Sequence, residues 1–566
     1  MAGLLEIGVS GLMAFQRSIN TTGHNIANSD TEGYSRQRVE LSTQTPHLTG
    51  AGWLGSGVKV AAVQRSYDDF LATQMRAAQS TASGLDVYAA HAGRIDNLLA
   101  DPNVGLDPSV QDFFDAMQVL ADNPASIPSR QALISETASM VDRFHDLSRQ
   151  FNTIREQTNQ ELSAVVDEIN GLSRSLARVN QNIIEAIGAS GGDDPNDLLD
   201  EREVLLNQLS ERVAITTVPQ DDGALNIFIG KGQALVIGGT AASLSTVQSE
   251  LDLGRYDIAF TDATGSRVIT DQLAGGEIGG LLSFREEIVD PAQNQLGLVA
   301  VGLSRELNAQ HRLGLDLDGS PGGALFSDPQ IETLGHGANR PGATATATFT
   351  DTGELAASDY LLEATGPASF TLTRLADGSS WNLNNQDRQD GIQFSIGGAA
   401  DAGDRFLIQP VRWAADRIRQ ETTDPRRLAA AAPVRALPAG NLVTPGPNLG
   451  GARVSQPEIS DTGNLPVTID LTWSPDLDND GVEDDPGFQV VGGPGGTLAY
   501  DPATDSGGKR FTFPGFGNMT FSVSGVPAAG DSFRIEENAG GVADNRNALA
   551  MAAIQGSDRL LGETGG

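Results

Sequence analysis

Residues 1–38 read MAGLLEIGVSGLMAFQRSINTTGHNIANSDTEGYSRQR. Four apolar residues recur in this stretch every seven positions, and Phe15 shares their face, so the stripe consists of Leu5, Leu12, Phe15, Ile19 and Ile26. This spacing predicts an amphipathic helix that packs along other helices. The polar run from Asn28 to Gly33 predicts the end of that helix and a turn. Periodicity alone also fits an ordinary core stripe of a monomer. However, a helix at the start of the chain has little partner surface within itself, and we therefore expect an assembly interface.

Composition excludes several classes of protein. The 566 residues are too many for one hydrophobic core and predict three or four domains. The formal net charge of −36 disfavours binding to nucleic acid or to anionic lipid. No apolar run approaches the roughly 20 residues of a membrane helix, and the N-terminus lacks the pattern of a cleaved signal peptide. The absence of cysteine excludes disulfides and thiolate chemistry.

Long helices dominate the first half of the sequence. We predict one from Gln64 to Asn97, and a second from Ser135 to Ala186 that carries a sustained heptad stripe of Val165, Ile169, Leu172, Leu176, Val179 and Ile183. A third is predicted from Asn196 to about Val213. Alternating apolar residues from Leu225 to Ile229 then predict a β-hairpin. A further helix is expected from about Pro291 to His311.

Short alternating strands predominate from about Gly342 to Gly540, and this region contains an internal repeat. Residues 394–408 align without gaps on residues 521–535, with eight identities in 15 positions. We interpret the repeat as two related β-units, each ending in a hairpin whose Gly-Asp turn precedes a Phe-x-Ile strand. A short helix is expected between Trp413 and Ile418. The segment from Ala429 through Pro447 is interpreted as a connector.

The sequence offers little sign of chemistry, and we predict no catalytic residues and no cofactor. The Gly-x-Ser-x-Gly pattern at 188–192 lacks the strand-to-helix context of a nucleophile. One group of carboxylates has the spacing of a calcium loop, namely Asp476, Asp478, Asp480 and Asp484. Gly487 stands where that loop needs a bidentate Glu. The group therefore predicts a weak calcium site at most, and the alternative is a solvated acidic hairpin tip.

Several motifs in the sequence resemble a known family. Ser10-Gly11-Leu12 and a group of mostly polar residues from the end of the predicted helix onward are similar to the N-terminal signature of flagellar rod, hook and hook-associated proteins. The residues of this motif are Asn25, Asn28, Thr31, Gly33, Tyr34, Ser35 and Arg36. The continuation 33–37 resembles the hook-associated protein 1 branch. Glu32 stands where the family often has Pro. The segments 196–202, 220–230 and 307–326 resemble the same branch.

The resemblance and the residue patterns together predict an α+β multidomain protein. We expect a long antiparallel helical bundle or coiled-coil domain, formed by the N-terminal and C-terminal parts, with an inserted β-rich region of two related units. The predicted parts are an N-terminal export and polymerisation segment (1–62), the helical bundle (63–325, with a β-hairpin region at about 214–285), the β-rich units (326–435 and 436–540) and a return helix (541–566). The family's amphipathic C-terminal helix is not recognisable before Gly566.

The resemblance implies a structural, non-enzymatic subunit of the bacterial flagellum that joins hook to filament. It also implies self-association in a tubular assembly, contact with hook protein and the next hook-associated protein, an export chaperone, and an extracellular location reached by type III export without a cleaved signal. One alternative is another flagellar axial subunit of the hook or rod. A second is a secreted β-rich adhesin or carbohydrate-binding protein.

Overall fold

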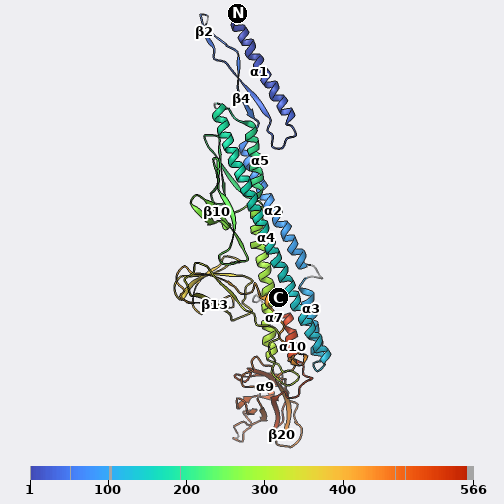
Figure 1. Ribbon diagram of the computed structural model, residues 1–566. Coiled ribbons are helices and arrows are strands. Elements are labelled where there is room, and N and C mark those ends of the chain that lie inside the picture. The colour runs from blue at the N-terminus through green and yellow to red at the C-terminus, as the bar shows by residue number, and fades with distance from the viewer. Residues whose placement is uncertain are drawn as a thin grey trace. The chain divides into compact units, whose positions relative to one another are not determined.

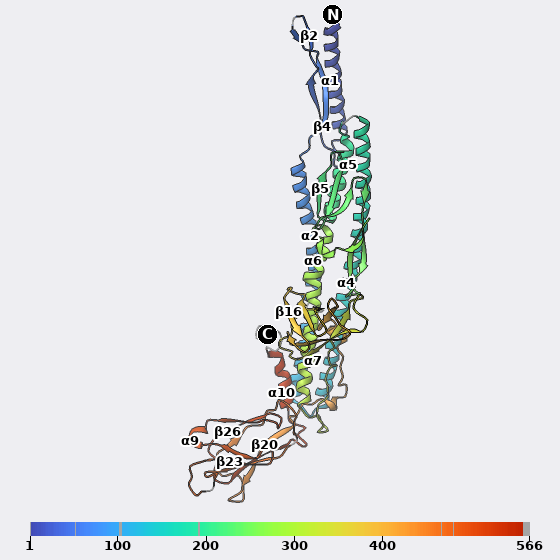
Figure 2. The same cartoon turned by 90° about the vertical axis from the view of Figure 1, so that its left-hand side faces the viewer.

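The computed structural model describes residues 2–50, 52–100, 105–190, 193–465, 467–478 and 480–557. The chain divides into a first unit (Met1–Leu98 and Phe151–Asp290) and a second unit (Leu99–Gln150 and Pro291–Gly566). Each unit combines helices with antiparallel sheets, so the α+β class is confirmed (Figures 1 and 2). None of the helices in the described ranges is long and apolar enough to cross a membrane.

The first unit begins with helix α1 (Ala2–Ala27), as the stripe predicted. A two-stranded antiparallel ribbon follows, made of β1 (Gln37–Thr43) and β4 (Val58–Arg65), and its far end carries the short pair β2 (His47–Thr49) and β3 (Gly52–Leu54). The turn after α1 depends on Gly33, whose φ of 76° lies in the left-handed region that favours glycine. Helix α1 packs against this ribbon.

Three helices continue the first unit. Helix α2 (Asp69–Ala100) begins five residues later than predicted, because Gln64 and Arg65 still pair with β1. Helix α4 (Ile127–Ser190) is longer than predicted, and its part from Phe151 onward belongs to this unit. Helix α5 (Asn196–Arg212) matches its prediction closely.

Strands and a short helix complete the core of the first unit. One sheet has the order β5-β6-β7-β8 and another the order β11-β10-β9; their strands are β5 (Ile215–Pro219), β6 (Leu225–Ile229), β7 (Gln233–Ile237), β8 (Thr240–Ala241), β9 (Ser243–Gln248), β10 (Tyr256–Asp262) and β11 (Gly265–Val268). The predicted hairpin at 225–237 is confirmed. Residues Gly276–Phe284 form helix α6, so the end of the expected β-hairpin region is helical. The buried stripe of α4 packs in one core with α5, α6 and both sheets.

The second unit is built on α3 (Asp107–Asp122), the first part of α4 and α7 (Asp290–Arg312). Buried His311 links three segments of it. Its Nδ1 lies 2.9 Å from the Gly323 carbonyl oxygen, and its Nε2 accepts the Ala429 N–H at 2.9 Å. Nearby, the buried Arg130 guanidinium donates to the Leu428 carbonyl at 2.6 Å. The segment around Ala429, which was interpreted as a connector, is therefore part of the core.

Two groups of strands complete the second unit. The first β-module contains β12 (Glu332–Gly335), β13 (Ala343–Phe349), β14 (Tyr360–Ala364), β15 (Ser369–Arg374), β16 (Ser380–Asn384), β17 (Arg388–Gln389), β18 (Ile392–Gly398) and β19 (Arg405–Gln409). The second β-module contains β20 (Val434–Asn441), β21 (Arg453–Val454), β22 (Ile469–Ser474), β23 (Gly487–Val491), β24 (Gly496–Ala499), β25 (Lys509–Phe513), β26 (Met519–Ser524) and β27 (Asp531–Glu537). Helices α8 (Ala414–Arg417) and α9 (Pro502–Asp505) are single turns.

The two β-modules have corresponding strand orders. In the first, a five-stranded sheet β12-β19-β14-β15-β16 accompanies a three-stranded sheet β13-β18-β17. In the second, the orders are β20-β27-β22-β23-β24 and β21-β26-β25. Each strand of the first module thus has the same place in its sheet as the strand of the second module whose number is higher by eight. The strand β20 begins at Val434, two residues before the boundary predicted for the second β-unit, and it runs through Pro438 at a bulge.

The predicted hairpins at the ends of the two β-units are wrong. Strands β18 and β19 lie in different sheets, as do β26 and β27, so each repeated Gly-Asp pair belongs to a loop between sheets. Gly403 and Gly530 have φ of 95° and 84°. The buried Asp531 carboxylate accepts the N–H groups of Ala528, Leu449 and Gly450 at 2.8–2.9 Å and the Asn441 amide at 2.8 Å. Burial raises the pKa of Asp531, but these donors outweigh burial and leave the pKa lowered.

The chain returns to α3 through helix α10 (Arg546–Ala552). The Asn545 amide donates to the Ala121 carbonyl at 2.7 Å. The buried face of α10 carries Ala548 and Met551, whereas Leu549 is exposed. Leu560 and Leu561, also expected on this helix, lie outside the described residues.

Candidate assembly interface

Helix α1 packs on its own ribbon through small and polar residues. Ala14 is the buried residue of the described part of this helix, at 2% exposure, and half-buried positions around it are Ser10, Gly11, Ser18, Thr21, His24, Asn25 and Asn28. The Ser10 hydroxyl accepts the Val58 N–H at 3.3 Å, and a Cβ placed on Gly57 would lie 2.3 Å from that hydroxyl. The close approach of helix and ribbon therefore requires short side chains on both.

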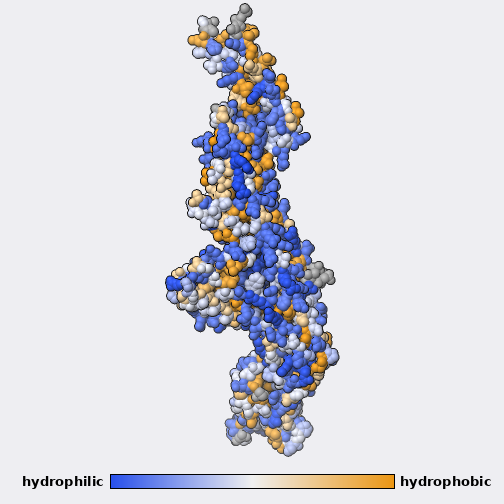
Figure 3. Space-filling view, viewed as in Figure 1, coloured by the Kyte–Doolittle hydropathy of each residue, from blue (hydrophilic) through white to orange (hydrophobic). Residues whose placement is uncertain are grey.

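The apolar stripe faces away from the ribbon. Its five residues are 65–73% exposed, and hydrophobic side chains gather along this segment in Figure 3. At about 100° per residue, the centre of the stripe lies more than a third of a turn from the face centred on Ala14. Leu4 and Met13 add to the exposed apolar surface. The packing of this chain therefore leaves the predicted interface residues uncovered.

The polar residues of the motif hold α1 to the ribbon. The Asn25 amide donates to the Gln37 carbonyl at 2.9 Å, and its Oδ1 accepts the Gln37 N–H at 2.8 Å. The same Oδ1 accepts the Tyr34 hydroxyl at 2.7 Å. Burial raises the pKa of Tyr34, and the nearby Asp197 and Asp200 raise it further, which keeps this hydroxyl a neutral donor.

Asn28, Thr31 and Gly33 shape the turn between α1 and the ribbon. The Asn28 amide donates to the His24 carbonyl at 3.1 Å, and the Thr31 hydroxyl donates to Asn28 Oδ1 at 3.3 Å. A Cβ placed on Gly33 would lie only 2.0 Å from Cγ2 of Val204 on α5. Gly33 is thus required both for its φ and for its contact with α5.

The second motif, at the start of α5, meets the first. The Ser35 N–H donates to Asp200 Oδ2 at 3.0 Å, and Arg65 pairs with Asp200 Oδ1 at 2.8 Å with both side chains less than a tenth exposed. The Gln37 amide donates to Asp197 Oδ1 at 3.0 Å. We call this set of contacts between the N-terminal segment and α5 the clasp.

The structure assigns different places to the other motif and interface residues. Arg36 is exposed and its side chain makes no ion pair with any described residue, although its carbonyl accepts the Ser66 N–H at 2.7 Å. Arg65 and Asp200 are buried members of the clasp that motif matching alone did not single out as partners. No spacing in the sequence signals this pair, because Arg65 ends β4 and Asp200 lies in α5, 135 residues further along the chain.

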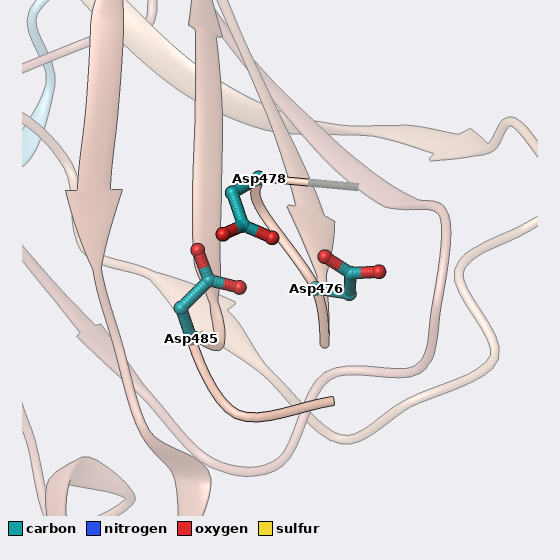
Figure 4. A group of neighbouring side chains, drawn as sticks. All are labelled: Asp476, Asp478 and Asp485. Atoms are coloured by element: carbon teal, nitrogen blue, oxygen red, sulfur yellow. The ribbon is translucent and has the colours of Figure 1, made fainter. Parts of the chain in front are cut away.

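The acidic loop of the second β-module brings together a different set of carboxylates from the predicted one. Asp476, Asp478 and Asp485 have oxygens within 4.8 Å of one another, whereas Asp480 and Asp484 are not in this group (Figure 4). Asp485 joins because a bridge pairs it with Asp476. Backbone N–H groups already occupy part of the cluster: Leu477 donates to Asp485 at 2.7 Å and Gly481 to Asp476 at 2.9 Å.

Comparison with known proteins places this geometry in a class. Residues 5–34, which include most of α1 and the turn after it, match the family described as flagella basal body rod protein. Residues 92–326 match the flagellar hook-associated protein FlgK helical domain, and residues 336–410 match the D2-like domain of flagellar hook-associated protein 1. The exposed helix, the clasp and the first β-module thus belong to a flagellar axial protein.

Relatives define the family more narrowly. The chain is 34% identical to flagellar hook-associated protein 1 of Salmonella typhimurium over 439 residues, covering 76% of this chain and 79% of that protein. It is 31% identical to the Escherichia coli protein of the same name, covering 83% and 89%. The solved structure of the flagellar hook junction protein FlgK from Burkholderia pseudomallei has a TM-score of 0.75 at 28% identity, covering 85% and 90%.

This chain belongs to the flagellar hook-associated protein 1 (FlgK) family, and the predicted family is confirmed. It is a structural subunit of the bacterial flagellum. The family is a structural one, and its members assemble with other flagellar components.

Proposed function

We propose that this subunit joins the hook to the filament through its outward apolar stripe on α1. The observation that carries the proposal is the orientation of α1, which packs on its ribbon by small residues and leaves five large apolar side chains exposed. Burying each of them is worth roughly 1.5–3 kcal/mol. A helix held in place by the clasp and covered by a neighbouring subunit would therefore supply much of the free energy of assembly.

The clasp supports the same proposal, because a docking helix works best when its orientation is fixed in advance. Asn25, Tyr34 and Gln37 fix α1 to the ribbon, and Asp200 fixes the ribbon to α5. The stripe then meets its partner with little further ordering. We propose hook protein, the next hook-associated protein and further copies of this chain in a tubular assembly as the partners.

Other parts of the expected organisation are proposals of the same kind. We infer that the two β-modules arose by duplication, an inference supported by the 15-residue repeat and by their matching strand orders. We also propose the five-part division of the chain with the second β-unit starting at Val434, a helical domain shared by N-terminal and C-terminal parts, an export chaperone, and an extracellular location reached without a cleaved signal.

The test uses charged substitutions in the stripe. Leu12→Asp with Ile19→Asp places two charges in the proposed contact, where each would be desolvated, so filaments should no longer attach to hooks. The matched control is Gln16→Asp with Asn20→Asp, which adds the same charge to the same turns of α1 at exposed polar positions. Filament attachment is scored by electron microscopy of cells that carry each variant in place of the natural protein. Normal attachment in the stripe variant would contradict the proposal.

A further inference from the structure

The tip of the ribbon carries an exposed apolar pair. Leu48 and Trp53 are direct partners across β2 and β3, so their side chains share one face, and they are 69% and 71% exposed. A neighbouring cross-strand pair, His47 and Leu54, lines a hollow beside α1. We call Leu48 and Trp53 the knob. A large exposed tryptophan at the end of a narrow ribbon is characteristic of a docking anchor.

A groove of about 570 Å³ lies elsewhere in the first unit, between α2 and α6. Buried Leu273 and Leu282 contribute to its lining, together with Leu85 and Tyr88 of α2. Its volume is within the range of sites that enclose a sizeable apolar group. It is therefore large enough to receive an aromatic side chain together with a leucine.

Glycines create this groove. A Cβ on Gly280 would lie 2.3 Å from the Gly84 carbonyl oxygen, and a Cβ on Gly84 would lie 2.9 Å from the Gly276 carbonyl oxygen. The two helices therefore cross with backbones in contact, and no side chain from the crossing fills the space beside it. Apart from Ile95, the buried residues of α2 are small or polar, with Ser80 and Gly84 among them, whereas Leu71, Met75 and Leu85 are exposed.

The ribbon that carries the uncharged knob and the groove differ in charge. No acidic residue occurs between Leu41 and Tyr67, although the whole chain has 73 of them, and this stretch carries the exposed Lys59 on β4. Acidic side chains line the groove, namely Asp271, Glu286 and Glu287. Only Glu286 among them pairs with a basic side chain of the described chain, Arg255, at 3.0 Å. A partner segment without acidic residues is thus favoured at the groove.

We propose that the knob of one copy docks into the α2–α6 groove of a second copy. Both surfaces are on the same chain and both are open in the single subunit. The stretch 42–66 around the knob has no acidic residue, whereas the groove is acidic, so the two surfaces do not repel each other. The contact is heterologous, since two different surfaces meet, and repetition of such a contact generates a ring or a helical tube. This inference rests on the proposed junction function and names a contact in addition to the stripe of α1.

The absence of cysteine makes the contact testable by crosslinking. Gly50→Cys adds a thiol at the turn of the ribbon, where an added Cβ meets no atom within 4 Å, and Thr81→Cys adds one at the groove. Neither change removes a residue of the knob. Cells that produce both single-cysteine variants and lack the natural protein are used to isolate hooks with attached junctions, which are treated with a short bismaleimide.

We expect a covalent dimer only when both variants are present, because each contact joins one knob to one groove. Pairing Gly50→Cys with Val218→Cys, an exposed position on β5, is the matched control and should give no dimer. Adding Trp53→Ser to the Gly50→Cys chain should lower the dimer yield at least about tenfold, as expected for loss of an aromatic anchor. If Trp53→Ser chains fail to assemble, Leu85→Glu in the Thr81→Cys chain tests the groove instead and should lower the yield similarly.

Two results would overturn the inference. One is absence of the mixed dimer from junctions that still carry filaments, and the other is equal dimer yield from Gly50→Cys alone, which would mean that tip meets tip. Either result leaves the proposed function intact if Leu12→Asp with Ile19→Asp still abolishes filament attachment. Continued attachment in that stripe variant would instead contradict the proposed function.

Discussion

Replacing Gly33 by alanine separates two physical demands on the clasp. The first demand is conformational, because φ at Gly33 is 76°, and a residue with a Cβ pays about 1–2 kcal/mol for a left-handed conformation. The second is steric, because the new methyl group would lie 2.0 Å from Cγ2 of Val204. Both effects act on the turn that presents Ser35 to Asp200. We therefore expect Gly33→Ala to open the clasp.

The assay is hydrogen exchange at two amides that follow the turn, one in the clasp and one in the contact between α1 and the ribbon. The Ser35 N–H donates to Asp200, and the Gln37 N–H donates to Asn25. The conformational cost alone corresponds to a roughly 5- to 30-fold loss of protection, and the overlap with Val204 adds to it. The thermal melt should change little, since the core of α4, α5 and the sheets does not include the clasp residues.

A second variant separates the steric contribution from the conformational one. Val204→Ala removes the methyl groups that the new Cβ would meet, so Gly33→Ala with Val204→Ala should recover the steric part and keep the conformational part. Val204→Ala alone is the control. Unchanged protection of Ser35 and Gln37 in Gly33→Ala would refute the reasoning, because it would show that the turn does not position the clasp.

Three further predictions concern the second unit. Asp531→Ala leaves three backbone N–H groups without their acceptor and should lower the stability in thermal melts by about 3 kcal/mol or more. Asp404→Ala removes the acceptor of two backbone N–H groups and should have a milder effect, and equal melts for the two variants would contradict this. Burial lowers the pKa of His311, so the unfolded chain takes up the proton at a higher pH than the folded chain does. The contribution of His311 to stability should therefore be complete above about pH 6.5 and should fall as the pH drops below that value. Denaturant titrations at several pH values should show a flatter pH dependence for His311→Gln. The acidic loop should bind calcium more weakly than micromolar, because backbone N–H groups occupy part of its cluster, and tight binding in calorimetry that is lost in Asp478→Ala would show otherwise.

The sequence predicted elements better than it predicted their partners. Helix α1, its end at the polar turn, α5, the hairpin at 225–237 and α7 were all recognisable from periodicity and turn residues. The repeated Gly-Asp pair was recognised too, but its structural role was not. A left-handed glycine followed by a capping aspartate suits a hairpin turn and a loop between sheets equally well, and only long-range strand pairing distinguishes them.

The candidate sites show the same limit. Linear spacing suggested Asp480 and Asp484, whereas the bridge between Asp476 and Asp485 selected a different carboxylate. The prolines after Ala432 suggested a connector and gave no sign that it lies in the core, yet Ala429 and Ala430 are fully buried and His311 accepts the Ala429 N–H. The sequence also could not predict which face of α1 packs on the ribbon. Hydropathy indicates where large apolar residues lie, and it does not indicate a contact made by the small residues Ser10, Ala14 and Ser18.

Helix α1 and the first part of α2, residues 69–84, share an inverted arrangement, with small or polar residues inside and large apolar residues outside. In α1 the inner face centres on Ala14 and the outer face carries Leu12 and Ile19; in α2 the inner face carries Ser80 and Gly84 and the outer face Leu71 and Met75. The stability of the first unit comes from a separate core around α4, so these outer faces are free to remain uncovered in the single subunit. Such faces gain their burial only when subunits meet. A substitution that enlarges an inner residue should therefore disturb the orientation of the helix, whereas one that charges an outer residue should spare the fold and weaken assembly.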